Sequence, residues 1–239
     1  MPSSTVYNLL EACRKPGCPI CRLQQQSVER YLDNQFYENV NSPNWRDQLR
    51  ASSGFCYEHA WLGANQRLGD ALGYSIIYRD IVNSILARLE DGDHSTHVSH
   101  RRPSLRRQLP QSARDTIEKV LDAFTPRKRC PACEAGDHAT RTLLSALVAE
   151  LGNPEMIQAL RSSEGLCLPH LRSALEHVRD QSASGQLIHI HREKLENLRT
   201  ELSEFIRKND YQASKEGFGA AGDAWLRAVG MIVGKRRES

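Results

Sequence analysis

The sequence predicts an all-α protein, a helical bundle built from two pseudo-symmetric repeats. Leucine occurs 27 times, against 21 for isoleucine and valine together, and this ratio favours helices over strands. Apolar residues recur at helical spacing, for example at Val28, Tyr31, Leu32 and Phe36. No segment shows the strict alternation of a half-buried strand. A cysteine pattern that occurs twice is the third observation.

Composition bounds the class of protein. The chain has 239 residues, of which 39% are hydrophobic and 26% charged, as in ordinary soluble globular proteins. No apolar run approaches the ~20 residues of a membrane span, so we expect no membrane partner. The first residues, Met1 to Ser4, carry neither the basic nor the apolar part of a secretory signal, which favours a cytoplasmic location. The net charge of +3 is too small to identify a partner.

Two motifs occur twice in the same order. Residues 18–21 read CPIC and residues 130–133 read CPAC. Residues 54–59 (GFCYEH) correspond in the same way to residues 165–170 (GLCLPH). The cysteine pairs are followed by 34 and 33 residues before the next cysteine, so the spacing is also repeated. This duplication predicts a repeated structural unit.

The repeats set the expected domain boundaries. We predict a first repeat over 1–92, a basic, histidine-containing linker over 93–112, a second repeat over 113–210 and a C-terminal segment over 211–239. The second repeat ends in a long predicted helix, about residues 185–208. A short helix is predicted near residues 225–232.

Each repeat contains the ligands of a closed zinc site, because a C-x-x-C followed by a C-x-x-H supplies three sulfurs and one imidazole. Proline at the first position of a helix is favourable, so Cys18 and Cys130 should each directly precede a helix. Two zinc ions per chain are therefore predicted, one in each repeat. The predicted ligands are Cys18, Cys21, Cys56 and His59 in the first repeat, and Cys130, Cys133, Cys167 and His170 in the second.

Other chemistries remain open for these cysteines. The same ligand types can hold an iron–sulfur cluster. A C-x-x-C pair is also the spacing of thioredoxin-like redox sites, although those normally lie in a strand–helix–strand setting. The seventh cysteine, Cys13, has no counterpart in the second repeat and is expected to be a small buried residue. No nucleophile elbow, phosphate-binding loop or dinucleotide fingerprint is visible, so we predict no catalytic residue and no other cofactor-binding residue.

With these motifs, the chain resembles a family of uncharacterised, mostly bacterial proteins that is classed as a domain of unknown function. The resemblance lies in the duplicated C-P-x-C and G-x-C-x-x-H motifs and in the closing segment, Asn209-Asp210-Tyr211, Gly222 to Ala228 and Gly234. It spans most of the chain and implies metal binding, but it brings no established activity.

Three functions are consistent with the sequence. The first is a non-enzymatic zinc-binding scaffold that contacts another protein or a second copy of itself. The second is a redox-responsive regulator whose zinc or iron–sulfur site is lost on oxidation, and the third is an enzyme with an open metal position. The apolar stripe of the long helix is the expected protein contact: Ile188, Leu195, Leu198, Leu202 and Phe205. Nucleic acid is a weaker alternative, based on Arg101, Arg102, Arg106, Arg107, Lys235, Arg236 and Arg237.

Overall fold

The computed structural model describes residues 3–65, 68–93, 111–209 and 217–234, and most of these residues lie in helices. Within these ranges there is no β-strand, so the all-α prediction is confirmed. Most of the predicted linker and both basic clusters lie outside the described residues. The helices flanking the linker reach into its predicted range, because α5 (Ala71–Asp93) ends at Asp93 and α6 (Gln111–Phe124) begins at Gln111.

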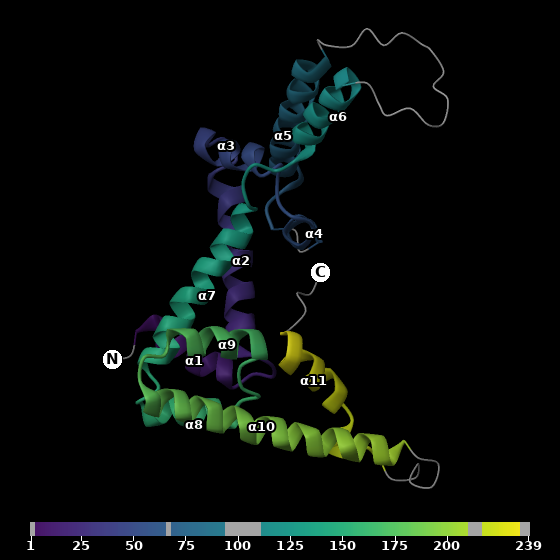
Figure 1. Cartoon of the computed structure of the whole chain (residues 1–239). Coiled ribbons are helices and arrows are strands. Elements are labelled where there is room, and N and C mark those ends of the chain that lie inside the picture. The colour runs from purple at the N-terminus through teal and green to yellow at the C-terminus, as the bar shows by residue number, and fades with distance from the viewer. Residues whose placement is uncertain (1–2, 66–67, 94–110, 210–216, 235–239) are drawn as a thin grey trace. The chain divides into compact units, whose positions relative to one another are not determined.

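The chain divides into two compact units that do not coincide with the two predicted repeats. Unit 1 consists of Met1–Val28 and Gly136–Glu238, and unit 2 consists of Glu29–Ala135. Consequently α2 (Pro19–Glu38) begins in unit 1 and ends in unit 2, whereas α7 (Pro131–Ala149) begins in unit 2 and ends in unit 1 (Figure 1).

The order of helices occurs twice along the chain. In the first half α2 is followed by α3 (Pro43–Ala51), α4 (Tyr57–Asn65) and α5. In the second half α7 is followed by α8 (Pro154–Ser162), α9 (Leu168–His177) and α10 (Gln181–Lys208). Proline opens α2, α3, α7 and α8, because its missing N–H leaves no helical hydrogen bond unmade at that position. The three-dimensional symmetry of the two repeats stays a prediction.

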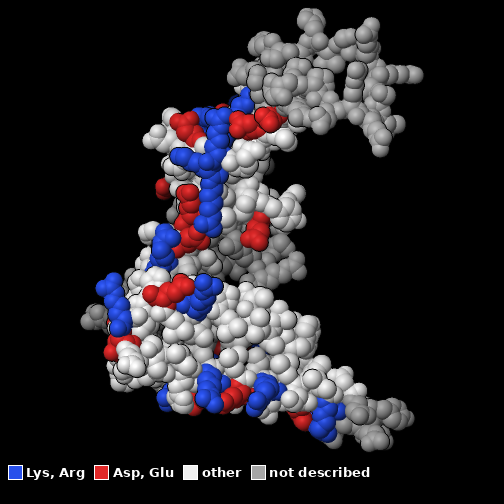
Figure 2. Space-filling model, in the orientation of Figure 1, with Lys and Arg blue, Asp and Glu red and all other residues white. Residues whose placement is uncertain are grey.

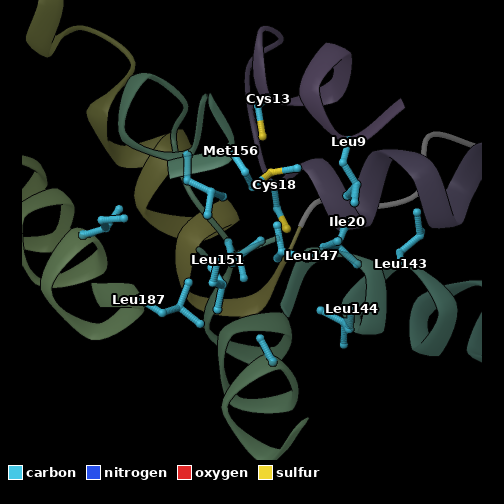
Figure 3. Packing of buried hydrophobic residues seen from close by; sticks show 14 of the residues in the cluster. Leu9, Cys13, Cys18, Ile20, Leu143, Leu144, Leu147, Leu151, Met156 and Leu187 are labelled. Atoms are coloured by element: carbon cyan, nitrogen blue, oxygen red, sulfur yellow. The ribbon is translucent and has the colours of Figure 1, made fainter. Parts of the chain in front are cut away.

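Unit 1 has an aliphatic core. It is formed by side chains from α1 (Ser4–Cys13), α2, α7, α8, α9 and α10. Leu9, Ile20, Leu147 and Met156 are fully buried there, and Cys13 and Cys18 belong to the same cluster (Figure 3). With Cys167, three cysteine side chains are therefore part of the hydrophobic packing of this unit.

A second, smaller apolar contact in unit 1 holds its C-terminal part. Leu198 of α10 packs with Ala224 and Met231 of α11 (Ala224–Val233). Phe205 stacks on Phe218, next to the short 3₁₀ helix η2 (Gly219–Ala221), with ring centroids 4.9 Å apart. The C-terminal part of the predicted apolar stripe on the long helix, from Leu198 to Phe205, is thus covered by the chain's own C-terminal segment.

Unit 2 is organised around aromatic side chains. Phe36 stacks on Tyr74, with centroids 4.0 Å apart, and meets Trp45 edge-on at 5.6 Å. Phe55 lies 5.9 Å from Phe36, so α2, α3, α5 and the turn before α4 share one cluster. This cluster fixes the turn that carries Cys56.

Candidate metal centres

Four donor groups converge in unit 1, at the N-termini of α2 and α9. The Nδ1 atom of His170 lies 3.1 Å from Sγ of Cys167, 3.3 Å from Sγ of Cys21 and 3.6 Å from Sγ of Cys18. The sulfurs of Cys21 and Cys167 are 3.6 Å apart. We call this quartet site 1.

Site 2 has the same composition and lies in unit 2, at the N-termini of α4 and α7. The Nδ1 atom of His59 lies 3.2 Å from Sγ of Cys56, 3.4 Å from Sγ of Cys133 and 3.6 Å from Sγ of Cys130. The sulfurs of Cys56 and Cys133 are 3.7 Å apart. His59 is completely buried.

Both quartets have the dimensions of a tetrahedral zinc site. Ligand bonds of about 2.3 Å to sulfur and 2.0–2.1 Å to nitrogen, at tetrahedral angles, place two sulfurs about 3.8 Å apart and sulfur about 3.6 Å from nitrogen. The observed separations of 3.6–3.7 Å and 3.1–3.6 Å agree with these values to within about half an ångström. All donor atoms of a quartet lie within 4.8 Å of one another.

The eight predicted ligands are all brought together, but their predicted assignment to two sites within the repeats is wrong. Site 1 combines the first C-P-x-C, Cys18 and Cys21, with the second C-x-x-H, Cys167 and His170. Site 2 combines the second C-P-x-C with the first C-x-x-H. The pairing is reciprocal, so each repeat contributes half of each site.

The length of α2 explains why the repeats do not close on themselves. A helix of 20 residues is about 30 Å long, so the chain leaves Cys21 and enters unit 2 before it reaches Cys56. Helix α3, with 9 residues, is about 13 Å long and packs on α5. Helix α7, with 19 residues, starts at site 2 and carries the chain into unit 1, where Cys167 follows.

The sequence positions the ligands through the starts of four helices. Two helices contribute to each site, and each helix contributes two candidate ligands: the residue directly before its first residue and its own third residue. Cys167 is the N-cap of α9, and Cys18 and Cys130 directly precede the prolines that open α2 and α7. The unpaired N–H groups and the partial positive charge of helix N-termini suit thiolate ligands.

Glycines make the turns that precede the second motif. Gly54 and Gly165 have φ angles of +91° and +85°, a conformation that costs glycine little. A side chain at Gly165 would also meet the Lys194 side chain at 2.7 Å. These turns let the chain re-enter a helix at the cysteine, as the repeated G-x-C pattern predicts.

Backbone hydrogen bonds connect the two motifs of site 2. The N–H groups of Arg127 and Lys128 both donate to the carbonyl oxygen of Ala51, at 2.8 and 2.9 Å. The segment before Cys130 is thereby fixed against the turn before Cys56. The Arg127 side chain is exposed and lies 3.5 Å from Asp122.

Site 1 has a neighbour that the sequence analysis did not single out. Gly234 follows α11 with a φ of +87°, and a Cβ atom placed there would lie 3.3 Å from Sγ of Cys21 and 3.5 Å from Sγ of Cys167. Only a residue without a side chain fits comfortably at this position. The glycine belongs to the closing segment on which the family resemblance was based, but nothing in the local sequence indicates that it lies against the cysteines.

Burial determines the state of the thiols. It raises the pKa of Cys133 to about 12 and that of Cys18 well above its ordinary value, with neighbouring cysteines adding to both shifts. The three thiols of one quartet cannot ionise together without a cation, and a divalent metal would supply the needed charge. None of the seven cysteines forms a disulfide bond.

Cys13 and the other described histidines lie outside both quartets. Cys13 is buried as expected, and burial raises the pKa of its thiol to about 11, so it is a protonated packing residue at neutral pH. His191 is buried as well: its Nε2 accepts a hydrogen bond from the N–H of Leu166 at 2.8 Å, and its Nδ1 lies 2.8 Å from the carbonyl oxygen of Leu187. His177 and His189 are exposed on their helices.

The fold and the two quartets define an all-helical protein with a pair of candidate Cys3His metal sites. Comparison with known sequences assigns the chain to a family. The chain belongs to the Family of unknown function (DUF6062), whose model matches residues 7–239. It is also similar to an uncharacterized 23.9 kDa protein encoded in the xynA 3′ region of Caldicellulosiruptor sp. (strain Rt8B.4), with 24% identity over 231 residues that cover 95% of this chain and 99% of that protein.

No solved structure gives a significant match. Among the described residues, no helix combines the length and the apolar character needed to cross a membrane.

Proposed function

We propose that this chain is a zinc-binding scaffold protein whose two metal ions are structural and which acts through protein–protein contact. The observation that carries the proposal is the closure of both quartets. Four protein donors within 4.8 Å of one another complete a tetrahedron and leave no position for water or a substrate. An open metal position is what metal catalysis requires, so the arrangement favours a non-enzymatic role.

Zinc is the metal that suits the donor set best. Thiolate and imidazole ligands in a tetrahedral arrangement are typical of zinc, and three thiolates with one neutral imidazole leave a small net charge of −1 on the site. Such a site stabilises the fold because its ligands come from distant segments. Cys21 and Cys167 are separated by 146 positions, and Cys56 and Cys133 by 77.

Metal analysis of protein purified without oxygen tests the proposal. We expect two zinc ions per chain, a colourless solution and cooperative loss of helical circular dichroism when a strong chelator removes the metal. A brown protein with charge-transfer absorption would instead establish an iron–sulfur protein and support the redox alternative. A chain that stays folded and binds no metal would refute both.

The exposed side of α11 is the protein contact that we propose. Trp225, Val229, Ile232 and Val233 are each at least half exposed, and their spacing places them along one side of the helix. No charged residue interrupts this surface, and the nearby Arg227 is held by Asp223 and Glu201. Along α10, by contrast, positive and negative side chains alternate, as in the pair Arg192–Glu196 (Figure 2).

A second copy of the chain is the partner that we propose for this surface, because an uncharged apolar helix face is complementary to itself in a two-fold dimer. Sedimentation velocity at micromolar concentration should show a dimer, and Val229→Glu should convert it to a monomer. Arg172→Glu, on the exposed side of α9, is the control and should leave the dimer intact. A wild-type chain that is monomeric across this range would refute self-association.

The cytoplasm is the location that we propose, because seven cysteines without a disulfide bond suit a reducing compartment.

A further inference from the structure

Unit 1 contains a cavity of about 680 Å³, a volume typical of sites for small molecules. Its walls are the segment before α2, the turn between α8 and α9, and the facing sides of α10 and α11. Cys18 and Cys167 contribute to the wall, so the cavity borders site 1 but is distinct from it.

The end of the cavity near α2 and the turn after α8 carries three cations, Arg22, Arg161 and Lys194. The ammonium group of Lys194 donates to the backbone carbonyl oxygens of Arg161, at 2.9 Å, and of Ser163. The guanidinium group of Arg22 donates to the carbonyl oxygen of Pro16, while its Nε atom is buried and has no hydrogen-bond partner. Among the described residues, neither Arg22 nor Lys194 has a carboxylate partner in a salt bridge.

This end of the cavity is therefore prepared for an anion. Glu164 is also in the wall and attracts the charge of Lys194, but it is not within salt-bridge distance. Backbone carbonyls already hold Lys194 in place, so its charge is positioned before a ligand arrives.

The other end of the cavity differs in character. Leu198 lies one helical turn beyond Lys194 on α10, and Leu226 and Met231 face it from α11. Glu201, about 10 Å along α10 from Lys194, is paired with Arg227, so the charges at this end are already compensated. An apolar surface thus begins next to Lys194 and extends for about the length of two helical turns.

The geometry points to a binding site for a small amphipathic anion, with its carboxylate or phosphate head on Arg22 and Lys194 and a short aliphatic tail against Leu198, Leu226 and Met231. The inference goes beyond the proposed scaffold function, and it requires no exchange of ligands at either metal site.

Calorimetric titration of the full-length, zinc-loaded chain tests the site. The probes are octanoate and octyl phosphate, which combine a head and a tail, with octanol and acetate as probes that lack one or the other. Saturable one-to-one binding of octanoate or octyl phosphate is expected, at least about tenfold tighter than that of octanol or acetate. The tighter of the two anions identifies the head group. Absence of binding by both at millimolar concentration, or equal binding of octanol, would overturn the proposal.

Two variants locate the binding. Leu226→Glu places a negative charge at the apolar end, and because Leu226 is 54% exposed the substitution should not unfold the chain. It is expected to weaken binding by at least about tenfold. Ile188→Glu, at an exposed position on α10 outside this cavity, is the matched control and should bind like wild type. Unchanged affinity in Leu226→Glu, or an equal loss in Ile188→Glu, would contradict the assignment.

Arg22→Gln tests the basic end and should weaken both anionic probes while leaving octanol unaffected. Because Arg22 adjoins Cys21, the zinc content of this variant is measured in parallel. Wild-type zinc content with unchanged anion binding would exclude Arg22 from the site. The failure of this site is distinguishable from failure of the proposed function, because zinc content and anion affinity are separate measurements.

Discussion

Pairs of cysteine substitutions distinguish reciprocal pairing from pairing within each repeat. Cys21 and Cys167 share site 1, whereas Cys21 and Cys56 belong to different sites. Each single Cys→Ser change should remove one of the two zinc ions. Cys21→Ser combined with Cys167→Ser should then keep one zinc ion per chain, and Cys21→Ser combined with Cys56→Ser should keep none.

The expected loss of stability in these variants follows from the sequence separation of the ligands. In the chain-entropy model, a cross-link that closes a loop of 146 residues stabilises a fold by about 5 kcal/mol, against about 4 kcal/mol for the 35 residues of a within-repeat link. A loss of about 5 kcal/mol is comparable to the whole stability of a small domain. Serine at one site 1 ligand should therefore destabilise unit 1 severely. The second serine at the same site should add little, since changes at shared partners are not additive.

The assay is zinc content after exhaustive dialysis, together with chemical denaturation of each variant. Aromatic packing in unit 2 is independent of site 1, so the double variant at site 1 should keep the near-ultraviolet signal of the Phe36, Trp45 and Tyr74 cluster. The opposite zinc stoichiometry, none for Cys21→Ser with Cys167→Ser and one for Cys21→Ser with Cys56→Ser, would refute reciprocal pairing.

Three further predictions concern residues around the sites. Gly234→Val should lower zinc retention at site 1 and reduce stability by at least about 1 kcal/mol, because the side chain meets two ligand sulfurs at a positive φ; retention equal to wild type in a competition with a chelator would contradict this contact. Cys13→Ser should lower the free energy of unfolding by about 1–3 kcal/mol, because it buries a hydroxyl, and should keep both zinc ions. Cys133→Ser should lower it by several kcal/mol and lose one zinc ion, and equal denaturation midpoints for the two variants would contradict the packing role of Cys13. Burial lowers the pKa of His191 below its unfolded value of 6.5, so the stability that this residue contributes is complete above pH 6.5 and is lost as the pH falls below that value. His191→Gln should therefore flatten the acidic part of the profile of stability against pH at constant zinc content. Parallel profiles for the variant and the wild type would contradict this role of His191.

Much of the local structure follows from the sequence alone. The prolines after Cys18 and Cys130 predict helix starts, and helices begin there. The long helix predicted from about residue 185 extends over Gln181–Lys208, with Asp180 as its N-cap: the Asp180 side chain accepts a hydrogen bond from the N–H of Ala183 at 2.8 Å. The eight candidate ligands, which the structure brings together, could be predicted because two motifs, each with a chemical reason, recur at the same spacing.

The pairing of these motifs could not be read from the sequence, because a repeat in sequence does not fix which copy each half-site contacts. That choice depends on helix length and on the direction in which each helix leaves its site. Gly136 illustrates the point: a Cβ there would lie 3.0 Å from the Val28 side chain, so α2 and α7 contact each other closely where a glycine permits it. The contact joins residues from different repeats, which no pattern within one repeat reveals.

Under the proposed function, reciprocal pairing determines when in folding the chain can bind its metal ions. The first repeat, 1–92, contains one C-P-x-C and one C-x-x-H, but these belong to different sites. Site 2 is incomplete until Cys133 is in place, and site 1 until His170 is. Because the candidate ligands of each site meet only when a distant segment has folded against them, we expect metal binding and tertiary folding to be coupled in both units. A structural metal in such an arrangement stabilises the long-range contacts between the halves of the chain, which are the contacts with the largest loop-closure cost.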